Sequence, residues 1–218
     1  MDNSFEAVLE QGLSRLSLSL PAEAGPRLLG LVDLLLKWNE KVNLTAITRR
    51  EEVLEKHIID SLAVAPYLTQ VQHLLDLGAG AGFPGLPLLL ALPSLKATLV
   101  DAVAKKVAFM KVAAVQLGVA QRAQARHLRA QGHPRAEGLE LVDCVISRAF
   151  MEPGAFLQLA HPYLLPQGQV VVMLGQTPNT STLETLGSAA GFRLEQRHTF
   201  TLPFSGDARG VAVFRRST

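Results

Sequence analysis

The chain has 218 residues, of which 48% are hydrophobic and 18% are charged, and its formal net charge is +2. This is the composition of a globular protein, and the length suits one main domain with an extension. No apolar run is long enough to span a membrane, and no signal-peptide pattern opens the chain. The single cysteine, Cys144, cannot form an internal disulfide. We expect it to be buried in a cytoplasmic protein that does not associate with membranes.

The charge is divided unevenly along the chain. Residues 1–70 carry 7 Lys/Arg and 10 Asp/Glu, a net charge of −3, whereas residues 71–218 carry 14 Lys/Arg and 9 Asp/Glu, a net charge of +5. A basic segment is compatible with a polyanionic substrate, although charges of this size also serve solubility alone.

The first 70 residues are predicted to be helical. Apolar residues at every third or fourth position indicate a helix over 27–38. Thr48 and Glu51 resemble a capping box that opens a second helix over 52–64. We therefore expect an N-terminal helical extension over residues 1–70.

From residue 73 onward, strand-like and helical segments alternate. Strands are predicted over 73–77, 95–100, 122–128, 141–146 and 168–174, and helices over 84–92, 103–117, 154–164 and 181–190. Segments 192–200 and 210–215 are expected to form a terminal antiparallel pair. The alternation predicts an α/β domain over 71–218, with a mainly parallel seven-stranded sheet covered by helices on both faces. Such sheets bind ligands at the carboxyl ends of their strands.

The segment DLGAGAGFP, after the first strand, is the most informative part of the chain. Glycines at alternate positions, Gly78, Gly80 and Gly82, let the backbone turn sharply and approach a ligand closely. The following helix would point its N-terminal amides at the loop. A dinucleotide fingerprint requires its third glycine where Phe83 stands. The spacing D-x-G-x-G-x-G instead resembles the first motif of Rossmann-like, class I methyltransferases that use S-adenosylmethionine (AdoMet).

Acidic residues flank this loop in sequence. Asp76 and the backbone amides of Gly80 and Gly82 are candidates for holding the ammonium and carboxylate groups of AdoMet. Asp101 ends the second strand, 19 residues after Gly82, where an acid can accept both ribose hydroxyls of an adenosine. The alternative role for Asp101 is to cap the helix that begins near Val103, and the two roles are compatible.

Further motifs together resemble the RsmG family, also called GidB or glucose-inhibited division protein B. They are WNEKVNLTAI, HIIDSL, GFPGLPL, VDAVAKKVAFM and VISRAF, within roughly residues 28–176. The resemblance implies a bacterial enzyme that uses AdoMet to methylate N7 of guanosine 527 in the 530 loop of 16S rRNA. Its substrate would be that RNA within the small ribosomal subunit or an assembly intermediate.

The resemblance also assigns cofactor contacts by position. They fall on Gly78, Phe83 and Arg148, with a pair near the adenine at Ala130 and Gln131. The family usually has an acid where Gln131 stands, and Ala136-Glu137 is a second candidate for the pair. Leu174 stands where the family commonly has a lysine, which leaves the RNA-contacting residues open.

The implied reaction needs no proton transfer. N7 of guanine has a lone pair and no proton, so alignment of the nucleophile, the methyl group and the sulfur can supply the catalysis. We therefore predict no general base and no metal. The candidates for positioning the reactants are Arg148, Phe150, His57 and Asp60.

Each positioning candidate also has a structural interpretation. The fork of Arg148 suits a carboxylate, a phosphate or guanine, and its alternative role is a structural ion pair. Phe150 either stacks on a flipped base or packs in the core. His57 and Asp60 lie three residues apart on one helix face, as a wall of the substrate site or a surface hydrogen bond.

Two alternative functions compete with this interpretation. One is an AdoMet-dependent methyltransferase acting on another RNA or on a small molecule, and the motifs VDAVAKK and VISRAF argue against it. The other is a noncatalytic AdoMet-binding factor for ribosome assembly, and the intact glycine loop argues against that. We expect a monomer with 16S rRNA as its partner.

Overall fold

A seven-stranded sheet forms the centre of the molecule in the computed structural model, which describes residues 3–148 and 150–217. The strand order is β3-β2-β1-β4-β5-β7-β6. The strands are β1 (His73–Leu77), β2 (Lys96–Asp101), β3 (Ala123–His127), β4 (Val142–Arg148), β5 (Leu164–Leu174), β6 (Phe192–Thr201) and β7 (Ala208–Arg216). β1 to β5 are parallel, and β7 lies antiparallel between β5 and β6. The predicted mainly parallel sheet with a terminal antiparallel pair is confirmed.

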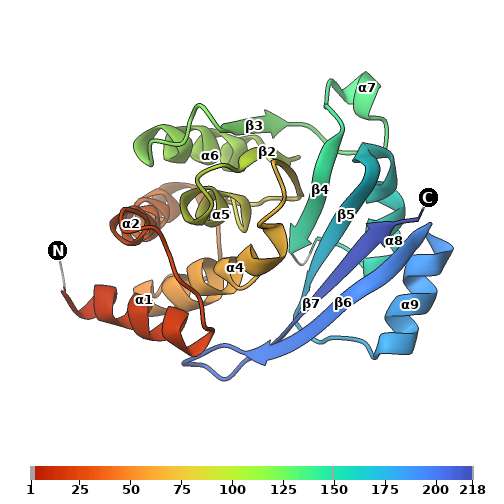
Figure 1. The fold of residues 1–218 in the computed structure, drawn as a ribbon. Coiled ribbons are helices and arrows are strands. Elements are labelled where there is room, and N and C mark those ends of the chain that lie inside the picture. The colour runs from red at the N-terminus through yellow and green to blue at the C-terminus, as the bar shows by residue number, and fades with distance from the viewer. Residues whose placement is uncertain (1–2, 149, 218) are drawn as a thin grey trace.

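Helices cover both faces of the sheet (Figure 1). One face carries α5 (Gly85–Ala91) and α6 (Ala104–Gln116), and the other carries α8 (Pro153–Ala160) and α9 (Thr180–Ala189). Side chains alternate along β1, so Leu74 faces the first layer while Leu75 and Leu77 face the second. The same alternation turns Asp76 toward the apolar layer formed by α5.

The N-terminal helices pack on the same face as α5 and α6 (Figure 1). They are α1 (Asn3–Arg15), α2 (Ala24–Val42), α3 (Arg50–Val53), the π-helix η1 (Leu54–Ile59), α4 (Asp60–Leu62) and the 3-10 helix η2 (Ala65–Leu68). Buried leucines of α2 and α5 belong to one hydrophobic cluster. The division at residue 70 stays a prediction, since sequence on its two sides contributes to one core.

Several predicted boundaries differ from those in the structure. The capping box was wrong: α3 begins at Arg50 after Arg49, whose side chain makes no cap hydrogen bond. The helix predicted over 154–164 ends at Ala160, because Pro162 lacks an N–H donor and a 3-10 turn (η3, His161–Tyr163) follows. A short helix, α7 (Pro134–Glu137), occupies a stretch without a predicted element. Among the described residues, no helix has both the length and the apolar character that crossing a bilayer requires.

Candidate functional site

The loop between β1 and α5 uses its three glycines in different ways. Gly78, Gly80 and Gly82 all have positive φ, at 72°, 61° and 88°. A Cβ on Gly78 would overlap the ring of Phe150, and one on Gly82 would overlap Leu86. A Cβ on Gly80 would meet no atom within 4 Å. The loop therefore leaves open space at Gly80, whereas the other two glycines allow close packing.

The amides of this loop are already engaged. Gly80 N–H donates to Asp101 Oδ2 at 2.9 Å, and Gly82 N–H donates to the Ala79 carbonyl at 2.8 Å. In this structure both amides therefore have partners within the chain, and the role of Gly80 and Gly82 in holding AdoMet stays a prediction. In this structure the two glycines contribute open space and a tight backbone turn, because their N–H groups donate to Asp101 and to the Ala79 carbonyl.

Asp76 carries an unpaired oxygen beneath the loop. Its Oδ2 accepts a hydrogen bond from the N–H of Gly85 at 2.9 Å, while Oδ1 is buried without a partner. Burial raises the pKa of this carboxyl group to about 7, and the Gly85 hydrogen bond and Arg148 oppose the rise. A cation placed beside Oδ1 would restore the charged form and complete its pairing.

Asp101 ties the first two loops together at the end of β2. Besides the Gly80 bond, its Oδ1 accepts from Val103 N–H at 2.8 Å. Val103, and not Asp101, is the N-cap residue of α6, so the predicted capping role of Asp101 is wrong, and its carboxylate instead holds the turn that precedes the helix. A carboxylate oxygen can accept more than one hydrogen bond, so this arrangement is compatible with ribose hydroxyls as additional donors.

Arg148 is the last residue of β4 and is held by the N-terminal helices. Its Nη1 donates to the Lys56 carbonyl at 2.7 Å and to Asp60 Oδ2 at 3.3 Å. Its Nη2 lies 3.0 Å from Nδ1 of His57. The structure thus brings together three of the four predicted positioning residues, and the alternative of a structural ion pair is also present.

His57 is neutral in this cluster. Burial, together with the charge of Arg148, lowers its pKa to about 3. Nδ1 therefore accepts from Arg148, which leaves the proton on Nε2 to donate to Thr45 Oγ1 at 3.0 Å. The imidazole stacks on the ring of Phe83 with centroids 4.8 Å apart. Phe83, at the end of the glycine loop, therefore fixes the loop against the π-helix that carries His57.

Asp60 is shared by two arginines. Its Oδ2 faces Arg148, and its Oδ1 lies 3.5 Å from Nε of Arg209, at the start of β7. Burial raises the pKa of Asp60, while both guanidinium groups oppose the rise. Arg209 is not among the site residues predicted from the sequence, because it lies 149 positions from Asp60 in the chain.

Phe150 lies over the glycine loop. Its ring is against Gly78, packs edge-on to Phe156 at 6.5 Å, and is 40% exposed. The alternative of a buried core aromatic is therefore wrong, because the ring covers the loop at the surface.

The two candidate adenine-contacting pairs lie in one substructure after β3. Glu137 of α7 accepts from the N–H of Gln131 at 2.8 Å and from that of His133 at 3.2 Å. Tyr163 donates to the same carboxylate and accepts from Gly132 N–H at 2.8 Å. Glu137 thus holds the loop that carries Ala130 and Gln131, and both oxygens of its carboxylate accept hydrogen bonds there.

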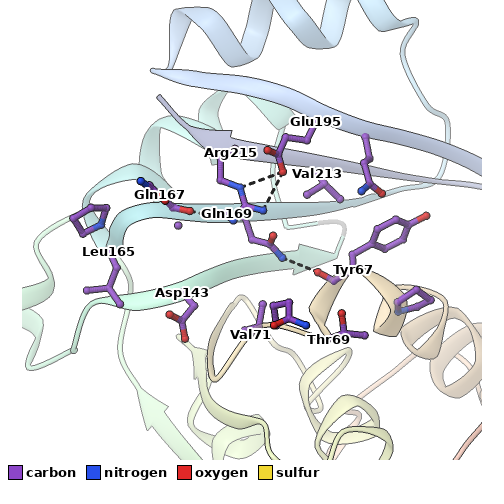
Figure 2. Close-up of a pocket in the computed structure, with 15 residues that line it drawn as sticks. Tyr67, Thr69, Val71, Asp143, Leu165, Gln167, Gln169, Glu195, Val213 and Arg215 are labelled. Carbon is purple, nitrogen blue, oxygen red and sulfur yellow. Dashed lines mark hydrogen bonds and ion pairs between the residues drawn. The ribbon is translucent and has the colours of Figure 1, made fainter. Parts of the chain in front are cut away.

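A hollow of about 300 Å³ lies at the opposite, amino edge of the sheet (Figure 2). Four of the polar side chains that line it are paired within the chain. Asp143 accepts two backbone N–H groups at the start of β1, Gln169 donates to the Tyr67 carbonyl, and Glu195 pairs with Arg215. The predicted ligand site is at the carboxyl edge, where open space and an unpaired carboxylate oxygen occur together.

The chain is similar to members of one protein family over nearly its whole length. Residues 26–203 match the family model described as GidB, rRNA small subunit methyltransferase G. A Myxococcus xanthus (strain DK1622) protein named ribosomal RNA small subunit methyltransferase G is 52% identical over 217 residues, covering 99% of this chain and 100% of the relative. A protein of the same name from Geobacter sulfurreducens is 39% identical and covers 93% of each chain.

Solved structures of methyltransferases share the fold. The 1,6-didemethyltoxoflavin-N1-methyltransferase of Burkholderia thailandensis aligns with a TM-score of 0.59 at 16% identity and covers 92% of each chain. TrmN from Thermus thermophilus aligns with a TM-score of 0.54 at 19% identity, covering 75% of this chain and 53% of that one. These likenesses confirm the predicted Rossmann-like class I methyltransferase fold. Matched by the family model over most of its length and by close relatives from end to end, the chain belongs to the GidB family, rRNA small subunit methyltransferase G.

Proposed function

We propose that this protein transfers a methyl group from AdoMet to N7 of guanosine 527 in the 530 loop of bacterial 16S rRNA. Membership of the GidB family supports this activity, because the relatives carry the name of an rRNA methyltransferase. The observation in the structure that carries the proposal is the buried, unpaired Oδ1 of Asp76, at the end of the strand that leads into the glycine loop.

The residues at the carboxyl edge fit AdoMet. The unpaired Asp76 Oδ1 suits its ammonium group, the space at Gly80 suits its methionine portion, and Asp101 suits its ribose hydroxyls. The loop with Ala130 and Gln131 would face the adenine. The loop between β1 and α5 is shaped by Gly78, Gly82 and Phe83, and Arg148 lies beside the Phe83 ring.

The chain's own residues would act by positioning. When bound, AdoMet would supply a methyl group on a sulfonium: the N7 lone pair of guanine would form a bond to the methyl carbon as the carbon–sulfur bond breaks, leaving a neutral thioether and releasing no proton. Neutral His57 and the carboxylate of Asp60 hold the Arg148 guanidinium in one orientation. Phe150 covers the loop from outside and would exclude water from the reacting atoms. No side chain has to accept a proton, which agrees with a buried imidazole that stays neutral.

The physiological context belongs to the same proposal. We infer that the protein acts as a monomer in the cytoplasm, on 16S rRNA within the small ribosomal subunit or an assembly intermediate. The net charge of +5 over residues 71–218 supports a polyanionic partner.

The decisive experiment measures transfer of labelled methyl from AdoMet to small subunits that lack N7-methylguanosine, followed by nuclease mapping. We expect label at the 530-loop guanine. Label at another nucleotide would favour another RNA position. Bound AdoMet without any transfer to subunits or their assembly intermediates would favour a small-molecule substrate or a noncatalytic assembly factor.

A further inference from the structure

A second hollow lies at the carboxyl edge, beyond the cofactor loop. Residues 175–177, which follow β5, form one wall, and residues 199–201 of β6 together with Ala208 and Arg209 of β7 form the others. Its volume of about 490 Å³ is in the range of small-ligand pockets. We call it the β6–β7 hollow.

The hollow contains an aromatic platform beside a cation. Phe200 and Arg209 are directly opposite each other in the β6–β7 register, so their side chains share one face of the sheet. The Phe200 ring packs its inner side against the hydrophobic core, and His198 stacks beside it at 5.9 Å with an interplanar angle of 18°. Base-binding surfaces for unpaired RNA combine these two elements, a supported aromatic ring and a nearby guanidinium.

Arg209 connects this platform to the cofactor side of the molecule. Arg148 and Arg209 pair with the two oxygens of the same Asp60 carboxylate, so only that carboxylate lies between their guanidinium groups. The Arg209 guanidinium also contacts Asp207 at 3.6 Å and its neighbouring Ala208 carbonyl at 2.8 Å. A guanidinium has five N–H donors, so these partners leave donors for a ligand.

The tip of the β6–β7 hairpin is anchored, which fixes the start of β7. Buried Glu55 of the π-helix accepts hydrogen bonds from Phe204 N–H at 2.6 Å and Ser205 N–H at 2.8 Å. The same helix carries His57, so one element positions both the cofactor-side cluster and Arg209. Contacts from one helical segment therefore connect the β6–β7 hairpin with the cofactor-side cluster.

We propose that the β6–β7 hollow receives the target guanine once it has left its stack in the RNA, with its face on Phe200 and its O6 accepting from Arg209. This inference rests on the proposed function and names the part of the site that recognises the substrate base. O6 is adjacent to N7 on the purine, so a donor to O6 leaves the N7 lone pair available. A pyrimidine offers a smaller stacking surface and lacks this pair of acceptors.

The test compares Phe200→Leu with Phe200→Tyr in methyl transfer to small subunits that lack N7-methylguanosine. Leucine keeps the apolar packing but removes the ring, so we expect kcat/KM for subunits to fall about 10-fold or more, whereas tyrosine retains near wild-type kcat/KM. The AdoMet dissociation constant and the melting temperature should stay close to wild type in both. A Phe200→Leu protein that is folded and transfers methyl within twofold of wild type would overturn the inference.

Arg209→Gln distinguishes a base contact from a phosphate contact. A base contact predicts a roughly 10-fold loss of kcat/KM with the salt dependence of subunit binding retained. If Arg209 instead neutralises a phosphate, the slope of log affinity against log salt falls by about one, and the base assignment is wrong.

Arg193→Gln, at an exposed site on the amino-edge portion of β6, is the matched control and should behave as wild type. If the wild-type protein itself methylates no subunit guanine, the proposed function fails. If the wild-type protein methylates the subunit guanine and the Phe200→Leu and Phe200→Tyr variants transfer methyl equally well, the inference about the hollow fails while the proposed function stands.

Discussion

The carboxyl and amino edges of one sheet both carry hollows, but they differ in how their polar groups are paired. At the amino edge, Asp143, Gln169, Glu195 and Arg215 in the lining of the hollow of Figure 2 bind partners in the chain. At the carboxyl edge, Asp76 Oδ1 and Thr177 Oγ1 are buried without partners. Within residues 3–148 and 150–217 the one other buried side-chain atom of this kind is Arg50 Nε.

This difference shows why cavity size alone is a poor guide to function. A buried polar atom without a hydrogen bond costs about 1–3 kcal/mol, so a fold retains it where a ligand or a reaction uses it. The carboxyl edge adds glycines at positive φ, a π-helical turn and charges buried at the ends of strands, whereas the amino-edge hollow is lined by Gln167, a non-glycine residue with a φ of 61°. The difference between the two edges therefore lies in the unpaired buried atoms and not in backbone strain.

The largest effect is expected from Gly80→Arg, which would erase the open space at the carboxyl edge. The φ of 61° strains any L side chain, and the long side chain would fill that space. We expect AdoMet affinity to fall by about 100-fold or more, since a charged group would also be placed against the cofactor's cationic centres. Calorimetry measures this directly. Gly25→Ala, where a Cβ meets no neighbour, serves as the control, and an unchanged affinity for Gly80→Arg would remove the assigned site.

Arg148→Ala should reduce stability and methyl transfer together. Removing one partner of a buried pair costs about 3–5 kcal/mol, and Arg209 keeps Asp60 partly compensated, so we expect a destabilisation of about 3 kcal/mol. Methyl transfer should be lost as well.

The double variant Arg148→Met with Asp60→Leu removes both charges of the pair and should recover most of the stability by denaturant unfolding. Activity should stay lost in this variant. If activity returns along with stability, Arg148 is an ion-pair residue only.

A smaller, pH-dependent effect is expected for Asp76. Burial raises its pKa to about 7, so below that pH the free protein holds the neutral acid and ionisation must accompany pairing with an ammonium group. Affinity for AdoMet is then present above about pH 7 and lost as the pH falls through that value. Between pH 7.5 and pH 6 we expect the dissociation constant to rise by about 10-fold.

Asp76→Asn is the comparison for this pH profile. This variant should bind AdoMet more weakly than wild type at pH 7.5, and its dissociation constant should stay constant down to pH 6. The amino group of AdoMet titrates equally in both experiments, so it does not account for a difference between the two proteins. His57, with a pKa near 3, does not contribute in this range. A wild-type profile as flat as that of the variant would contradict the assignment of Asp76.

The smallest functional effect is expected at the amino edge. Asp143→Ala leaves the two N–H groups at the start of β1 without their acceptor, and this should reduce the free energy of unfolding by about 1–3 kcal/mol. The AdoMet dissociation constant measured on the folded protein should not change. A marked loss of AdoMet affinity would mean that the two edges are coupled and that the contrast between them is incomplete.

Local patterns in the sequence were sufficient to predict the fold and part of the candidate site. The alternation of strands and helices, the glycine spacing and the acids Asp76 and Asp101 are signals that lie within a few residues of each other. A tight loop and the end of a strand are set by local backbone preferences, so their positions at the carboxyl edge follow from the chain order of a parallel sheet.

Only the tertiary structure decided which distant side chains meet. Arg148 contacts His57 across 91 positions of sequence, and Arg209 reaches the Asp60 carboxylate from the final strand. Glu137 holds the loop of Gln131 by its backbone, a role that no spacing rule indicates. The capping box at Thr48 failed for the same reason, because a short helical segment takes its ends from the core it packs against. Such partners depend on how whole elements pack, and a sequence pattern carries that information only weakly.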